Sequence, residues 1–156
     1  MKITVKTNVH APVGKVWSFW TEPEHMVKWN NASDDWHSPK AENDLRVGGN
    51  FSVRMEAKDG SSGFDFTGKY DAVEKNALIE YTMEDGRKVK VSFASKEDET
   101  TITETFDALR VGSLIMLLTG RLHCGIRLWR VFRFLGCGAK VSEMSSGSHG
   151  AAGILS

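Results

Sequence analysis

The stretch that decides the fold is FSVRMEAKDGSSGFDFTGKY, residues 51–70. Apolar side chains recur at every second position on both sides of the turn sequence KDGSSG. A period of two places successive side chains on opposite faces of a β-strand. The stretch therefore predicts a hairpin with one apolar face, formed by Phe51, Val53 and Met55 on one strand and by Phe64, Phe66 and Tyr70 on the other.

The same alternation continues in three later segments, residues 78–83, 88–94 and 101–107. Turn sequences separate these segments, and the EDGR between the first two is a strong hairpin signal. Residues 2–9 and the short segment 36–41 also predict strands. Together the segments predict an antiparallel sheet that is apolar on one face.

Two short helices are predicted between the first strand and the second. Four apolar residues of APVGKVWSFW share one helical face: Val13, Val16, Trp17 and Trp20. The next residues, TEPE, predict a capping box in which Thr21 caps a second helix and Glu24 reaches back. This helix is expected to run to about Trp29.

The composition changes sharply near Asp107. Residues 1–107 hold 14 basic and 19 acidic side chains, whereas residues 108–156 hold 6 basic and 1 acidic. The whole chain has no net charge, which gives no reason to expect a nucleic-acid partner. Arginines recur through the apolar run 113–136, which argues against a membrane span.

Neither a secretory signal nor a disulfide framework is indicated. The N-terminal residues alternate without an apolar core segment, and two cysteines are too few for a framework. A cytoplasmic location is therefore expected. The five histidines are scattered and match no zinc spacing, so neither a metal nor a cofactor is expected.

Four stretches, taken in order, resemble the Aha-type family of START-like proteins, which is named for activators of a heat-shock chaperone's ATPase. They are APVGKVWSFWTEPEHMVKWN, ASDDWHSP, DLRVGGNFSVRMEAKDGSSGFDFTGKY and ITETFDA, all within residues 1–108. The resemblance implies the α+β helix-grip fold of the SRPBCC superfamily. In that fold a curved antiparallel sheet and two short helices surround a long C-terminal helix. It also implies a cavity between sheet and helix, which in the wider superfamily takes lipids, hormones and other apolar molecules.

The sequence departs from this family after Ala108, where the family continues with a polar loop and a helix that is acidic on its outer face. Here the Arg-rich LRVGSLIMLLTGRLHCGIRLWRVFRFLG follows. One hypothesis is that a shift of the reading frame produced this ending. A sheet with one apolar face still needs a covering layer, so an atypical helix is expected over 109–136. The chain then forms one START-like domain, residues 1–136, family-like to 107, with a flexible tail over 137–156.

Twelve residues are candidates for lining the cavity, because alternation or the resemblance places them on its inner side. Core packing is the alternative explanation for each apolar member. Two tyrosines favour a ligand, since a buried phenol needs a hydrogen-bond partner and can orient a bound molecule. The candidate ligand-binding residues are Trp36, Phe51, Val53, Met55, Phe64, Phe66, Tyr70, Tyr81, Met83, Phe93, Glu104 and Phe106.

Two side chains are candidates for acid–base chemistry. Alternation places Glu104 on the apolar face, where a carboxylate is costly unless it is paired or protonated. It could bind a ligand hydroxyl or transfer a proton; pairing with an arginine or a tyrosine hydroxyl is the alternative. His37 follows Trp36 near the expected mouth of the cavity, and a solvated histidine is the alternative there.

Three functions from different classes follow. The first is a non-enzymatic domain that binds a small hydrophobic, lipid-like molecule. The second is a co-chaperone-type module that binds a chaperone protein and activates its ATPase in a stress response. The third, ranked last, is a cyclase- or hydrolase-like enzyme that uses Glu104 or His37. A homodimer is expected if the C-terminal segment leaves the apolar face open.

Overall fold

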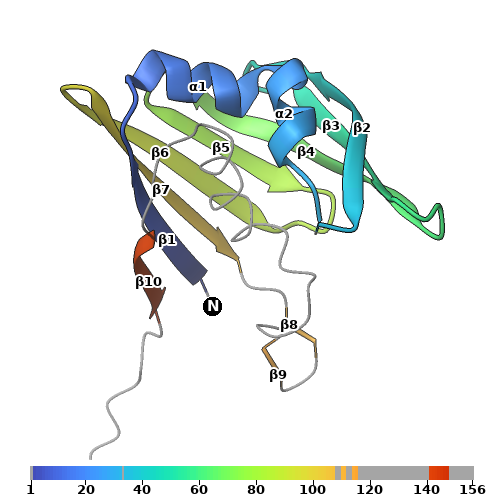
Figure 1. Ribbon diagram of the computed structural model, residues 1–156. Helices are drawn as coiled ribbons and strands as arrows, with labels where there is room; N and C mark the ends of the chain where they lie inside the picture. Colours follow the sequence, from blue (N-terminus) through green and yellow to red (C-terminus); the bar gives the residue numbers. More distant parts are fainter. Residues whose placement is uncertain (1, 33, 108–109, 112–113, 116–140, 148–156) are drawn as a thin grey trace, which may run out of the picture.

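One curved antiparallel sheet of eight strands holds most of the residues that the structure describes (Figure 1). The computed structural model describes residues 2–32, 34–107, 110–111, 114–115 and 141–147. The strands of the sheet follow the order β10-β1-β7-β6-β5-β4-β3-β2. Their bounds are β1 Lys2–Val9, β2 Trp36–Asn43, β3 Asn50–Ala57, β4 Gly63–Glu74, β5 Leu78–Met83, β6 Lys88–Lys96, β7 Glu99–Asp107 and β10 Val141–Gly147.

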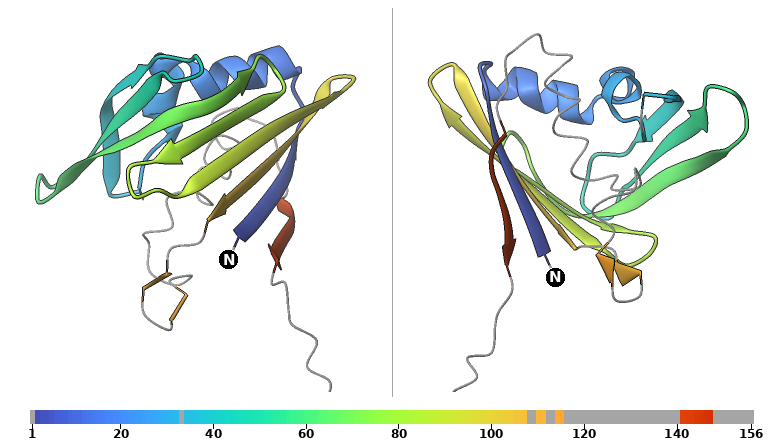
Figure 2. Two further views of the ribbon diagram at one scale, coloured as in Figure 1. Left: turned by 180° about the vertical axis from the view of Figure 1, so that it is seen from behind. Right: turned by 60° about the horizontal axis from the view of Figure 1, so that its bottom comes forward.

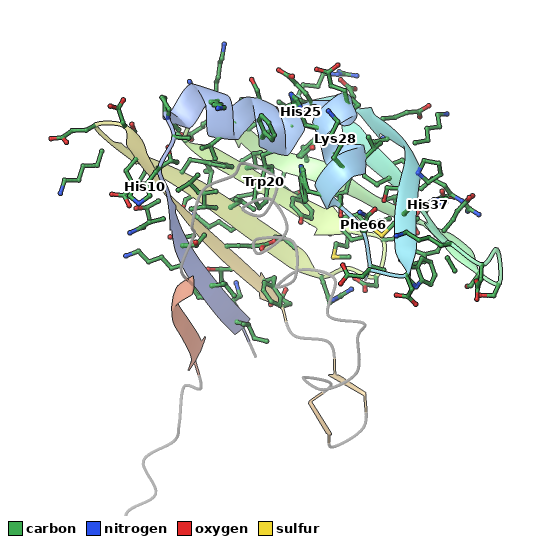
Figure 3. All side chains as sticks on the ribbon, in the orientation of Figure 1. His10, Trp20, His25, Lys28, His37 and Phe66 are labelled. Carbon is green, nitrogen blue, oxygen red and sulfur yellow. The ribbon has the colours of Figure 1, made fainter. Side chains whose placement is uncertain are left out.

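Two helices lie across the concave side of the sheet, α1 (Val13–Thr21) and α2 (Pro23–Trp29) (Figures 1 and 2). Trp20 points from α1 toward the sheet and meets Phe93 of β6 edge to face, with the ring centroids 5.7 Å apart (Figure 3). Trp29 of α2 lies 5.3 Å from Trp20 and donates a hydrogen bond from its ring nitrogen to the Phe19 carbonyl. The helices therefore pack on the sheet through tryptophans, and the expected α+β architecture is confirmed.

The alternation expected from the sequence holds across the sheet. In β3 and β7 the buried side chains are those at every second position, as the period of two requires. The strand register aligns these inner side chains in rows that cross the sheet. One row contains Tyr70, Tyr81, Val89, Phe106 and Ile3, and the next contains Val73, Ile79, Val91, Glu104 and Val5.

The capping box expected at the start of α2 was wrong. Thr21 is the last residue of α1, and its hydroxyl donates to the Trp17 carbonyl at 2.8 Å. Glu22 stands at the N-cap of α2 without a side-chain cap, and Pro23 occupies the first helical position. Proline is favoured there because its missing N–H would have no partner inside the helix. The proline, rather than the threonine, sets the start of α2.

The EDGR hairpin is confirmed. Gly86 N donates to the Met83 carbonyl and Met83 N to the Arg87 carbonyl, each at 2.9 Å. Gly86 has φ 81°, a left-handed conformation that glycine adopts without steric cost. The pattern is a tight turn followed by a glycine in the left-handed region, which is common in hairpins with three-residue loops.

The C-terminal segment differs from expectation where the structure describes it. Arg110–Val111 (β8) and Leu114–Ile115 (β9) pair as two short strands, where a helix was expected. The Gly-Ser between them in the sequence is itself a two-residue hairpin signal. The rest of the expected helix, residues 116–136, lies outside the described residues.

The expected tail over 137–156 contains a strand instead. Val141–Gly147 forms β10, which pairs antiparallel with β1 from Lys2↔Gly147 to Thr7↔Val141. Without β10, β1 would be an edge strand with unpaired backbone N–H and C=O groups. β10 pairs with these groups. The other residues of the expected tail lie outside the described part of the chain. Among the described residues, neither helix has the length and hydropathy needed to cross a bilayer.

Candidate ligand-binding site

The concave face of the sheet carries the candidate ligand-binding residues. Nine of the twelve are buried in the structure, with exposed fractions of 6% or less. Most of the candidates therefore pack in the core of the domain. The nine are Phe51, Val53, Met55, Phe66, Tyr70, Tyr81, Phe93, Glu104 and Phe106.

Four aromatic rings from β3, β4 and β5 form a cluster on this face. The Phe51 ring lies between the other three, with its centroid 5.5 Å from Phe66, 5.4 Å from Tyr70 and 5.0 Å from Tyr81. Offset and edge-to-face pairs at these distances are attractive beyond the area that they bury. Gly68 lies opposite Phe51 in the strand register and leaves space for its ring. We call these four rings the aromatic cluster.

The Tyr70 hydroxyl links the aromatic cluster to the helices. It donates to Asn43 Oδ1 at 2.7 Å, and the Asn43 side-chain amide donates to the Thr21 carbonyl at the end of α1. The hydrogen-bond partner expected for the buried Tyr70 phenol is therefore Asn43, the last residue of β2. Asn43 was not predicted as a site residue, because nothing in the sequence around it shows that the end of β2 lies beside the end of α1.

Glu104 lies on the inner face as alternation predicted. It is fully buried, and in the register it stands between Val91 of β6 and Val5 of β1. Among the described residues it is the only charged side chain that is buried. The carboxyl group of Glu104 is therefore buried between two valines, in surroundings where a charged group is costly.

Next to the aromatic cluster, β4 extends beyond the end of β5 and leaves a free edge. Residues 64–67 of β4 pair with β3 but have no partner on β5, whose last residue pairs with Gly68. A pocket of about 230 Å³ lies beside this free edge. We call it the rim pocket, and it is lined by Phe64, Asp65, Phe66, Thr67, Met83, Glu84, Asp85 and Arg87.

The rim pocket combines an apolar wall with a polar lip. Three candidate residues, Phe64, Phe66 and Met83, supply the wall. A fourth, Trp36, packs behind it with its ring 5.4 Å from Phe64. The remaining pocket residues come from β4 and the EDGR turn. The turn was predicted from the sequence, but its place in a pocket was not, because the pocket arises from the unequal lengths of β4 and β5.

His37 lies on the other face of the sheet. It points outward beside β2 and its Nε2 lies 3.6 Å from Glu56 Oε2 (Figure 3). Arg54 donates to the same carboxylate at 3.0 Å, and this hydrogen bond is the main reason why the pKa of Glu56 is lowered. His37 and the buried Glu104 are therefore separated by the sheet and do not form one acid–base pair.

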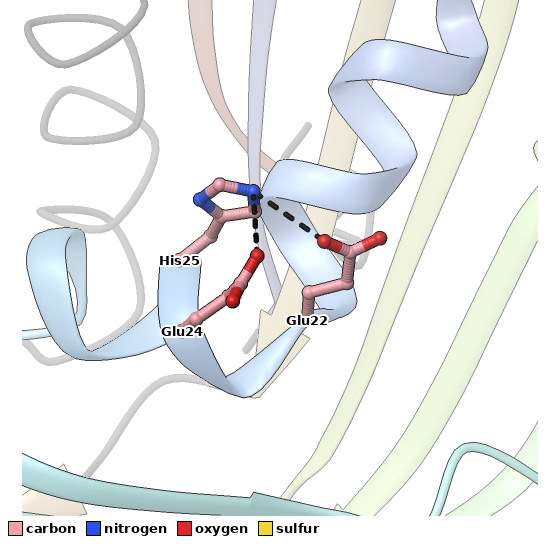
Figure 4. Close-up of side chains that lie close together, drawn as sticks. All are labelled: Glu22, Glu24 and His25. Atoms are coloured by element: carbon pink, nitrogen blue, oxygen red, sulfur yellow. Dashed lines mark ion pairs between the residues drawn. The ribbon is translucent and has the colours of Figure 1, made fainter.

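One cluster that sequence analysis missed lies at the start of α2 (Figure 4). His25 Nε2 is 3.4 Å from Glu22 Oε2 and 3.7 Å from Glu24 Oε1, and its ring stacks on Phe19. Donor atoms of the three residues lie within 4.8 Å of one another, as metal ligands would. Both glutamates are exposed, however, and exposed acidic groups commonly lie close to a histidine without a metal, so we assign no metal to them.

Comparisons with known proteins agree with this architecture. A family model described as activator of Hsp90 ATPase homolog 1-like protein matches residues 10–116. The match ends soon after the composition change at Asp107. The comparison with curated proteins gives no match.

Solved structures show the same likeness. An AHSA1-like protein from Aeromonas hydrophila is 37% identical, with a TM-score of 0.75, over 87% of this chain and 92% of that one. Protein Chr148 from Cytophaga hutchinsonii is 44% identical, with a TM-score of 0.68, over 86% and 90%. Protein CV1439 from Chromobacterium violaceum is 18% identical with a TM-score of 0.71, over 86% and 96%, and shows the fold alone.

Proposed function

The chain belongs to the family of activator of Hsp90 ATPase homolog 1-like proteins, and on this premise we propose that it binds small apolar molecules in the rim pocket. One observation carries the proposal: the inner-face residues Phe64, Phe66 and Met83 form the wall of a pocket that is open to solvent. Ligand sites are typically concave and apolar, with a few polar groups placed at the edge.

The arrangement behind the pocket supports this function. Phe66 belongs to both the rim pocket and the aromatic cluster, so the wall rests on rings that are themselves tightly packed. A wall held by packed neighbours loses little side-chain freedom when a ligand binds, which lowers the entropic cost of binding. Burial of the ligand's apolar surface supplies the affinity, at about 25 cal/mol per Å² as an upper bound.

The described surface gives less support to docking of a protein partner through apolar contacts. Protein interfaces usually depend on a few large side chains buried at their centre. Among the described residues, Val47 is the one large apolar side chain that is exposed, with an exposed fraction of 63%. The described surface therefore offers an apolar wall in the rim pocket and no exposed patch of large apolar side chains among the described residues.

The proposal predicts that replacing Phe64 by alanine weakens binding of an apolar probe about tenfold, because one aromatic wall contact is worth about 1.4 kcal/mol. The probe is N-phenyl-1-naphthylamine, which is neutral and fluoresces more strongly in apolar surroundings. The measurement is the dissociation constant from a fluorescence titration. Phe64 is partly exposed, so the variant is expected to stay folded.

The matched control is Phe19→Ala. Phe19 is also partly exposed, but it packs on His25 at the helices and is not among the residues that line the rim pocket. This variant is expected to bind the probe as tightly as the unchanged chain. Equal losses in both variants, or no saturable binding to the unchanged chain, would contradict the proposed function.

A further inference from the structure

We infer that the rim pocket selects apolar molecules that carry a positive charge, such as aryl or alkyl ammonium ions. This inference rests on the proposed function and names the class of ligand. It is based on two features of the pocket, the negative charge of its lip and the aromatic side chains of its wall. The lip holds three carboxylates, those of Asp65, Glu84 and Asp85, against the single guanidinium of Arg87.

Two of the carboxylates already have cationic partners. Asp85 Oδ2 accepts from Arg87 Nε at 2.7 Å, so the guanidinium is committed within the turn. Asp65 Oδ1 lies 3.6 Å from Arg54 Nη1. The exposed fractions of the two side chains are 56% for Asp65 and 39% for Arg54, so water weakens this ion pair. These contacts leave the pocket lip with an excess of negative charge.

Glu84 supplies the charge that is available to a ligand. Among the described residues, no basic group lies within 4.0 Å of its carboxylate. The turn holds its backbone in place, because Gly86 N donates to the carbonyl of the preceding Met83 and Met83 N pairs across the turn with Arg87. An exposed carboxylate at the lip keeps its hydration until a cation approaches, so it stabilises a bound cation at small desolvation cost.

The wall favours the same ligand class. Phe64 and Phe66 present aromatic rings, and a cation near the face of such a ring is attracted by the ring's negative electron density. The thioether of Met83 is soft and polarisable and accommodates alkyl groups. An ammonium ion with an apolar body would place its charge between the lip and the rings. A carboxylate-bearing ligand would instead meet like charges at the lip.

The test compares two probes of nearly the same shape, phenyltrimethylammonium and its neutral isostere tert-butylbenzene. Binding is followed by amide proton–nitrogen correlation spectra of the full chain, at the signals of residues 64–67 and 83–87. The inference predicts tighter binding of the cation, and weaker cation binding as ionic strength rises. The Glu84→Gln variant should bind the cation about two- to fivefold more weakly, the range expected for one exposed ion pair, and should lose more affinity for the cation than for tert-butylbenzene.

The matched control is Glu74→Gln, which removes an exposed carboxylate at the other end of β4 and should change neither titration. If both probes bind equally and Glu84→Gln has no effect, the charge selectivity is wrong while the apolar site stands. If neither probe shifts these signals, both the inference and the proposed function are overturned.

Discussion

Replacing Phe51 by alanine is expected to lower the free energy of unfolding by about 3–5 kcal/mol. The Phe51 ring is 4% exposed and is surrounded by Phe66, Tyr70 and Tyr81. Its removal leaves a cavity that the β-sheet backbone cannot close, so the loss includes both apolar transfer and lost packing contacts. Urea unfolding monitored by tryptophan fluorescence measures the change.

The control for this variant is Val47→Ala. Val47 is 63% exposed, so its truncation should change the free energy of unfolding by less than about 0.5 kcal/mol. A loss below about 1 kcal/mol for Phe51→Ala would mean that the aromatic cluster is not the centre of the core. The wall of the rim pocket would then lack the rigid support that the proposed function requires.

The second large effect is expected at Gly68, where an added methyl group has no room. A Cβ at this position would lie 2.5 Å from Phe51 Cζ and 2.6 Å from Phe51 Cε1, well inside van der Waals contact. Gly68→Ala should therefore destabilise the chain by about 1–3 kcal/mol through overpacking. The measurement is again the free energy of unfolding in urea.

Two further variants test whether the clash with the Phe51 ring causes this destabilisation. Gly14 lies in α1 with no atom within 4 Å of an added Cβ, so Gly14→Ala should be neutral or stabilising by up to about 1 kcal/mol. In a Phe51→Ala background, Gly68→Ala should cost much less than in the unchanged chain, because the clashing ring is gone. Additive losses in the double variant would show that the ring is not what excludes the methyl group.

Much of the sheet was predictable because its signals are local. The alternation around Phe51 and Phe64 fixed which side chains face inward, and the glycine of EDGR matched the positive φ that the turn requires. The helical face of Val16, Trp17 and Trp20 was equally clear, and all three are buried. In each case the pattern that predicts the element lies within the element itself.

The features that were missed depend on contacts between distant segments. β10 joins the sheet through backbone pairing with β1, and the polar sequence VSEMSSG gives little sign of this. The rim pocket exists because β4 is longer than β5, a relation between strands rather than a motif. Asn43 reaches Tyr70 across the sheet for the same kind of reason. Such relations follow from topology, which no single segment specifies.

We propose that apolar molecules bind in the rim pocket rather than on the outer face of the sheet. The most direct measurement is a titration of the isotope-labelled chain with 1-naphthol, a neutral aromatic probe, followed by amide proton–nitrogen correlation spectra. If the rim pocket is the site, residues 64–67 and 83–87 show saturable shift changes, with little change at the outward-facing His37 and Lys90. No saturable change at the pocket, or larger changes on the outer face, would contradict it.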